Sequence, residues 1–289
     1  MSHTCLVMSG GGIYGYTMLG SLAYMYENGM LNSIDTYIGT SMGAIIGYLL
    51  AIGFTPLEIT MHLHKTKVLN SLAQFDFVSM ASGHGASDWN ILQKELEKLT
   101  LEKIGEFVNL QDLKRKYNKT LVCATYNMDT RSMEYIDPET KPDIPALVAI
   151  RMSANVPFIF DVFKYQNGHY IDGGILDNLP IEYALNRYGI SEVSETVDSK
   201  DKILCIAIDY VGQEKTHTSY SSIELLYNVL LAPSMMMSKE KMRLSRCFST
   251  FYRLRTRKDV KFFNFDVKPS IALDMFSDGY NDARNGGEL

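Results

Sequence analysis

The chain has 289 residues, of which 46% are apolar and 21% are charged, and its formal net charge is −5 at pH 7. This composition is typical of a globular protein with a full core, and it excludes a low-complexity or collagen-like chain. We expect no nucleic-acid partner.

Strands and helices are predicted in alternation along the first half of the chain. Strands are predicted at residues 4–8, 37–38, 120–125, 132–136, 162–166, 169–171 and 203–209. Helices are predicted at residues 16–26, 44–50, 56–69, 90–99, 109–116, 144–152, 178–186, 221–244 with an interruption at Pro233, and 271–283, with a loop at 75–87. Asp88 or Asn90 is the expected cap of the fourth helix, and Asp177 or Asn178 that of the helix through 186. Asn167-Gly168 is the expected turn of a hairpin. This order predicts an α/β protein with three α/β/α layers around a mostly parallel sheet.

The amino terminus and the cysteines indicate an intracellular protein. The apolar stretch Cys5 to Met8 is too short for a signal peptide, and the longest apolar run, Ala44 to Phe54, is about half of the roughly 20 residues needed to cross a bilayer. The four cysteines lack metal-ligand spacing, so we expect reduced thiols and neither a metal nor a cofactor. A cytoplasmic protein is expected, with peripheral association with a membrane.

Residues Gly39 to Gly43 read Gly-Thr-Ser-Met-Gly, the G-x-S-x-G pattern, between a short apolar strand and an apolar helix. The small residues around Ser41 permit the tight strand-to-helix turn that exposes a nucleophilic hydroxyl. The pattern therefore predicts a serine acyl hydrolase.

A glycine-rich turn follows the first strand. Its backbone N–H groups, at Gly10, Gly11 and Gly12, can form an anion-binding nest for the oxyanion of an attacked ester, and the N–H of Met42 is a further donor. Gly10, Gly12 and Gly15 also fit the dinucleotide-binding pattern. Asp35 precedes the second strand, however, whereas a ribose-binding acid belongs at the far end of that strand.

The general base is less evident from residue types alone. A Ser-His-acid triad needs a histidine, and among the six only His84, on a glycine-flanked loop, is a serious candidate. The others lie at strand edges, on polar helix faces or in polar loops: His3, His62, His64, His169 and His217. Asp172-Gly173-Gly174 follows a predicted hairpin strand, where paired glycines let a carboxylate approach a neighbour, although Asp-Gly-Gly is also a common turn.

Four motifs in this order resemble the patatin-like phospholipase family. They are the turn Ser9 to Gly15, Gly39 to Gly43, the segment Ser153-Ala-Asn-Val-Pro-Phe-Ile-Phe160, and Asp172-Gly-Gly. They lie within about residues 5–182, and we expect residues 190–289 to complete one patatin-like domain spanning residues 1–289.

The resemblance implies a lipid acyl hydrolase of phospholipase A type with a Ser-Asp dyad. Ser41 is then the nucleophile, Asp172 is the general base, and the glycine-rich turn forms the oxyanion hole without a metal. The remaining motif glycines shape the turns: Gly15, Gly39, Gly43, Gly173 and Gly174. Tyr14 departs from the family, which usually has Arg or Lys there, so head-group attraction or oxyanion support near this turn is expected to differ.

Two other functions remain open at this point. One is an α/β-hydrolase-type esterase with a Ser-His-Asp triad, and the other is a lipid-binding protein without turnover. The aromatic stretch Phe158 to Phe163 is either core or part of an acyl channel.

A basic segment, residues 239–261, contains nine basic residues against Glu240 and Asp259, a net charge of +7. It predicts either a face that meets anionic lipid or a solvated helix followed by a charge-guarded edge strand. The expected partners are a phospholipid or other acyl lipid substrate and a membrane surface.

Overall fold

The computed structural model describes residues 3–72, 84–190, 201–209, 222–257, 259–260 and 265–286. Residues 75–83 of the expected loop at 75–87 lie outside the described residues, and so do His217, Lys258 and Lys261.

A mostly parallel eight-stranded sheet forms the centre of the fold, in the order β5-β6-β3-β2-β1-β7-β8, with β4 also paired to β3. Strands β3, β2, β1, β7 and β8 are parallel, and β4, β5 and β6 add antiparallel pairs. The bounds are β1 (Cys5–Met8), β2 (Thr36–Thr40), β3 (Thr120–Asn127), β4 (Ser132–Ile136), β5 (Phe163–Tyr165), β6 (Gly168–Asp172), β7 (Ile203–Asp209) and β8 (Thr250–Arg255). The predicted α/β class is confirmed.

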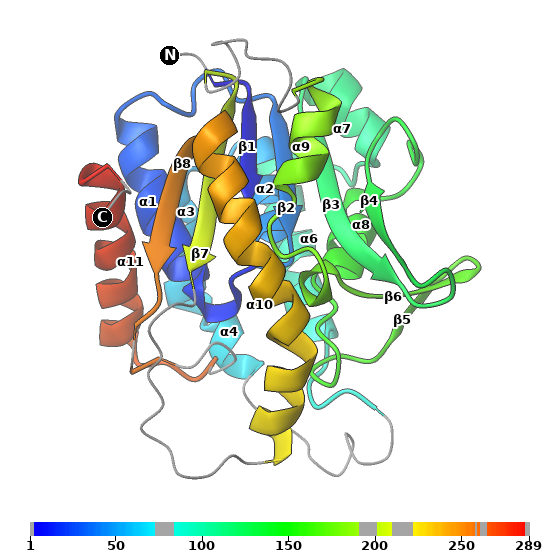
Figure 1. The fold of residues 1–289 in the computed structure, drawn as a ribbon. Coiled ribbons are helices and arrows are strands. Elements are labelled where there is room, and N and C mark those ends of the chain that lie inside the picture. The colour runs from blue at the N-terminus through cyan, green and yellow to red at the C-terminus, as the bar shows by residue number, and fades with distance from the viewer. Residues whose placement is uncertain are drawn as a thin grey trace.

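Helices cover both faces of this sheet, and Figure 1 shows α9 and α10 in front of it and α2 behind. The helices are α1 (Gly15–Glu27), α2 (Met42–Ala51), α3 (Pro56–Thr66), α4 (Val68–Ser71), α6 (Asn90–Ile104), α7 (Leu110–Tyr117), α8 (Ala146–Ser153), α9 (Ile181–Arg187), α10 (Ser222–Phe248) and α11 (Pro269–Arg284). Alternate residues of β1 enter two separate cores: Leu6 and Met8 pack in one, Cys5 and Val7 in the other. Since successive strand side chains point to opposite faces, the two cores make three layers.

The last helix joins this body through direct backbone contact with the first. A Cβ atom on Gly20 would lie 1.9 Å from the Phe276 carbonyl oxygen, and one on Gly279 would lie 1.9 Å from that of Thr17. Only glycine permits so close a helix pair, so α11 is held against α1 from the other end of the chain.

Two predictions about helices are wrong, each for its own physical reason. Neither Asp177 nor Asn178 caps α9, which begins after Pro180. The Asp177 carboxylate instead accepts hydrogen bonds from Tyr135 and Lys241. Helix α10 also continues through Pro233. Pro233 is exposed, so the backbone carbonyl one turn earlier, which receives no N–H from the proline, can accept a hydrogen bond from water.

Other boundaries differ in smaller ways. Helix α3 ends at Thr66 because Lys67 is left-handed, and α6 continues to Ile104, where Gly105 is left-handed. The predicted hairpin is confirmed as β5 and β6, but its register places Gln166 and Asn167 in the turn. Within the described ranges no single helix has the length and apolar content of a membrane span, and only α2 and α3 together, bent by 120°, reach that content.

Candidate active site

Strand register brings Ser41 and Asp172 together. Residues 123–124 of β3 pair with both β2 and β4, and residues 125–127 pair with both β4 and β6. Strands β2 and β6 therefore occupy the same edge of β3 in succession, and they run toward each other. Thr40, the last residue of β2, pairs with Ala124, and Asp172, the last residue of β6, pairs with Thr125. The two strands end head to head, with Ser41 directly after one of them.

Ser41 occupies a strained turn between β2 and α2, with φ 55° and ψ −120°. The flanking glycines make that turn possible. A Cβ atom on Gly39 would lie 2.5 Å from the Ala44 nitrogen, and one on Gly43 would lie 2.6 Å from the Ser9 carbonyl oxygen. This geometry is that of a nucleophile elbow.

The Asp172 carboxyl is buried and faces the serine. Burial raises its pKa to about 6, and hydrogen bonds with the Ser41 side chain and the Gly174 N–H partly offset that rise. The Gly174 N–H donates to Asp172 Oδ1 over 2.7 Å. Gly173 lies against β3, since a Cβ atom on it would be 2.5 Å from the Ala124 carbonyl oxygen. The Asp-Gly-Gly turn thus holds the Asp172 carboxyl in a buried position beside the Ser41 hydroxyl.

The end of α8 fixes the backbones of both residues. The Ser41 N–H donates to Ser153 Oγ over 3.0 Å, and that hydroxyl donates to the Ala124 carbonyl over 2.6 Å. Two residues later, the Asn155 carbonyl accepts the N–H of Asp172 over 2.9 Å. Ser153 and Asn155 were predicted only as members of the segment Ser153 to Phe160, without roles of their own. Two polar residues spaced two apart at the end of an apolar helix were the signal that could have identified them.

The glycine-rich turn lies beside Ser41, because a Cβ atom on Gly10 would be 3.4 Å from Ser41 Cβ. Its donors are not equivalent. The Gly10 N–H donates to the Asn178 carbonyl over 3.0 Å, which corrects its expected role as an oxyanion donor. Within the described part of the chain, the N–H groups of Gly11, Gly12 and Met42 have no acceptor. Gly15 packs on the Met42 side chain, because a Cβ atom on Gly15 would lie 2.8 Å from Met42 Cγ.

The histidines that the structure describes have other partners or are exposed. His84 is exposed, with Nδ1 3.5 Å from Asp161, while His62 pairs with Glu95 and His169 with Asp129. Of the histidines that the structure describes, none is hydrogen-bonded to Ser41 or Asp172. Nor do the described residues contain a group of three or more His, Cys, Asp or Glu side chains suited to a metal.

Tyr14 points into the protein. Its side chain is buried, and its hydroxyl donates to the carbonyls of Val260 over 2.7 Å and Arg257 over 3.1 Å. Where the family usually has a cation, this chain therefore has an anchor for the segment after β8.

Comparison with known proteins places the chain among related sequences. The family model described as Patatin-like phospholipase matches residues 6–185. The chain is 34% identical over 192 residues to "Probable lipid hydrolase 463L" of Invertebrate iridescent virus 6, covering 63% of each chain. It is 28% identical over 193 residues to the uncharacterised protein YqhO of Bacillus subtilis, covering 61% of this chain and 64% of that one. The chain thus spans less than two thirds of these relatives' length.

Solved structures share the fold. VipD from Legionella pneumophila has a TM-score of 0.54 at 16% identity, covering 99% of this chain and 67% of that one. ExoU of Pseudomonas aeruginosa, in complex with SpcU, has a TM-score of 0.51 at 14% identity, covering 99% and 53%. The family model matches more than half of the chain, and this match shows that the chain belongs to the patatin-like phospholipase family.

Proposed function

We propose that the chain is a lipid acyl hydrolase of phospholipase A type that cleaves fatty acyl esters through a Ser41–Asp172 dyad. The observation that carries the proposal is the strand register that ends β2 and β6 head to head on β3 and so places the Ser41 side chain against the buried Asp172 carboxyl. Family membership supports the lipid substrate.

The chemistry follows from the geometry. Ser41 Oγ attacks the ester carbonyl carbon while its proton passes to the Asp172 carboxylate, and the N–H groups of Gly11, Gly12 and Met42 are the proposed donors to the oxyanion. Collapse breaks the bond to the alcohol oxygen, which takes the proton from Asp172, and leaves an acyl-Ser41 ester. Water then attacks this ester with Asp172 again as the base, releasing the fatty acid. A carboxyl with a pKa of about 6 is a stronger base than an ordinary aspartate and is still mostly ionised at pH 7.

A lipid-panel assay tests the reaction. Ser41→Ala and Asp172→Asn should each lower turnover by roughly a thousandfold or more, while the matched variant His84→Ala should retain it. A protein inactivated by His84→Ala but not by Asp172→Asn would indicate a triad instead. Covalent labelling of Ser41 by a fluorophosphonate separates catalysis from binding, because a folded wild-type chain that is never labelled would be a lipid-binding protein.

Membrane contact is the second part of the proposal, and the basic segment supports it less directly than expected. Lys241 is buried against Asp177, Arg253 pairs with Asp209, and Arg257 pairs with acids on both sides. Strand β8 lies at the sheet edge, which agrees with the predicted alternative of an edge strand in this segment. Much of the charge is therefore used within the fold.

Helix α10 offers a better surface. Leu225, Val229 and Met236 are 54%, 63% and 76% exposed, and their spacing of four and seven residues places them on one face. The opposite face is buried yet carries Ser234, Ser238 and Ser245. The helix thus has its apolar side outward, the reverse of a solvated helix, and Figure 1 shows its first half extending beyond the strand ends.

Charge favours an anionic lipid surface as the partner of this face. Lys239 and Arg246 are exposed on the next turns of α10, beside the apolar stripe, and Arg243, which is also exposed there, pairs with Glu240. An apolar stripe followed by basic residues is the pattern of helices that lie in a membrane interface. Helix α10 also contacts the turn after Asp172, so the helix that carries this face packs close to the dyad.

Vesicle co-sedimentation tests this surface. Replacing Leu225 and Met236 by Ser should weaken binding to phosphatidylserine-containing vesicles by roughly tenfold or more. The same replacement of Leu57 and Met61, which are equally exposed on α3, is the matched control and should not weaken it. Equal effects of the two double variants would contradict the assignment to α10.

A further inference from the structure

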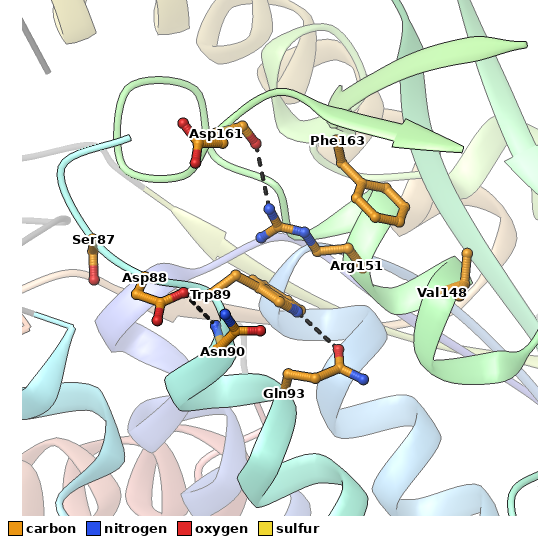
Figure 2. Close-up of a pocket in the computed structure, with 9 residues that line it drawn as sticks. All are labelled: Ser87, Asp88, Trp89, Asn90, Gln93, Val148, Arg151, Asp161 and Phe163. Carbon is orange, nitrogen blue, oxygen red and sulfur yellow. Dashed lines mark hydrogen bonds between the residues drawn. The ribbon is translucent and has the colours of Figure 1, made fainter. Parts of the chain in front are cut away.

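A pocket lies beside Arg151 of α8, and Figure 2 shows the Arg151 guanidinium between Asp161 on one side and Asp88 and Trp89 on the other. The pocket has a volume of about 400 Å³. Only 8% of Arg151 is exposed, and its guanidinium carbon lies 4.4 Å from the ring centre of Trp89, 5.3 Å from that of Phe163 and 5.4 Å from that of Phe160. Phe160 is buried in the hydrophobic core, so the core alternative predicted for Phe158 to Phe163 holds for that residue, whereas Phe158 is exposed.

This buried cation is incompletely paired. Its Nη2 donates to the Asp161 carbonyl over 3.3 Å, whereas Nη1 is buried and has no hydrogen-bond partner. Within the described residues no carboxylate lies within ion-pair distance of the guanidinium. Burial lowers the pKa of Arg151 to about 10, and the more distant charges of Asp161 and Asp88 partly oppose that change. A desolvated guanidinium with a free N–H is a ready partner for an oxyanion.

The rim of the pocket carries the opposite charge. Asp88 and Asp161 are exposed, and each accepts a backbone N–H: Asp88 that of Asn90 in its own segment over 2.9 Å, and Asp161 that of the distant Gly85 over 2.7 Å. The pocket thus presents one cation at its floor and two carboxylates at its opening. A simple anion would meet the floor favourably and the rim unfavourably, whereas a zwitterion matches both.

We propose that this pocket binds a zwitterionic phosphate ester, with its phosphate on Arg151 and its ammonium group between Asp88 and Asp161. The ligand would be the head group of a phospholipid or the free glycerophosphodiester left after deacylation. The choice of these sources rests on the proposed function, but the pocket's charge pattern does not.

Hydrogen bonds connect the pocket to the dyad. The Asp161 carbonyl that accepts from Arg151 also accepts from Asn155 Nδ2 over 2.9 Å. The backbone carbonyl of Asn155 holds the N–H of Asp172. A head group bound at Arg151 would therefore lie against the segment that positions the general base.

Binding should be measured on the full chain carrying Ser41→Ala, so that no probe is hydrolysed. Titrations with glycerophosphocholine, glycerol 3-phosphate, choline and phosphatidylcholine vesicles separate the free ester from the membrane-borne head group. We expect glycerophosphocholine to bind more tightly than the other soluble probes. Arg151→Met should weaken it by roughly tenfold or more, while Arg115→Met, the same change on the exposed face of α7, should not.

Asp88→Asn supplies an independent test, because asparagine keeps the oxygen that accepts the Asn90 N–H and removes only the charge. It should weaken glycerophosphocholine binding and strengthen glycerol 3-phosphate binding, and this change of sign would not arise from misfolding. Unchanged binding of both probes in folded Asp88→Asn and Arg151→Met proteins would overturn the proposal. A chain that binds the ester but never hydrolyses lipid would refute the proposed function and leave this pocket standing.

Discussion

Replacing Asp172 by Asn should stabilise the protein at neutral pH while abolishing turnover. The folded pKa of about 6 lies above the ordinary value of 3.8, so the folded chain holds this proton more tightly than the unfolded chain. As pH rises from about 4 to about 6, the wild type therefore loses stability that the neutral asparagine keeps. A rise of about two pKa units corresponds to about 3 kcal/mol in the free energy of unfolding. The wild type has lost this contribution above pH 6, where Asp172 is ionised.

This difference is large enough to measure. With an unfolding entropy of about 2.1 cal/mol/K per residue, about 3 kcal/mol corresponds to a Tm difference of roughly 5 °C for a chain of this length. Asparagine can retain both local contacts, since its oxygen accepts from Gly174 and its amide donates to Ser41. Differential scanning calorimetry at pH 4 and pH 7.5 should show Asp172→Asn with the higher Tm only at the higher pH.

A second buried aspartate provides the control. Asp177 accepts a hydrogen bond from the buried Lys241 ammonium over 2.6 Å, so Asp177→Asn should lower the Tm at pH 7.5 by leaving that charge poorly paired. If Asp172→Asn had no stabilising effect at pH 7.5, or the same effect at both pH values, Asp172 would not be a desolvated carboxylate and the argument for its basicity would fail.

Three further predictions concern the elbow and its base. The kcat/KM of the wild type should rise with pH around an apparent pKa of about 6 and level off above it, because Asp172 must be ionised to accept the Ser41 proton; a profile flat from pH 4 to 8 would contradict this. Ser153→Ala, which leaves the Ser41 N–H and the Ala124 carbonyl without their partner, should cost about 1–2 kcal/mol in chemical denaturation and lower kcat more than it changes KM. Gly43→Ala should prevent fluorophosphonate labelling and lower the Tm, since the new methyl group meets the Ser9 backbone at 2.6 Å; labelling at the wild-type rate would show that α2 can shift freely.

The local features of the site could be predicted from the sequence because their signals are local. G-x-S-x-G between an apolar strand and an apolar helix specifies a tight turn, and the structure has that turn at Ser41. Alternating strands and helices likewise predicted the parallel sheet. The hairpin was predicted from Asn167-Gly168, although its two-residue turn lies one position earlier.

Features that depend on distant partners could not be predicted in this way. The cap assigned to Asp177 failed because Tyr135 and Lys241, both far away in sequence, take its carboxylate. Gly10 was grouped with its neighbours as a donor, but only the fold shows that the Asn178 carbonyl occupies its N–H. Arg151 lies within an apolar helical pattern and gave no sign that aromatic rings would surround it.

One short segment explains how a dyad can work without an imidazole between its members. A direct transfer from hydroxyl to carboxylate needs the two groups held at hydrogen-bond distance, because no third ring spans the gap. Register on β3 brings the strand ends together, and the end of α8 then fixes both backbones, with the Ser153 hydroxyl on the Ser41 N–H and the Asn155 carbonyl on the Asp172 N–H. Since these holders are two residues apart, the nucleophile and the base cannot separate without deforming one rigid stretch of chain. The same stretch carries the hydrogen bond to the Asp161 carbonyl, so the positions of the dyad and of the Arg151 pocket are set by a single structural element.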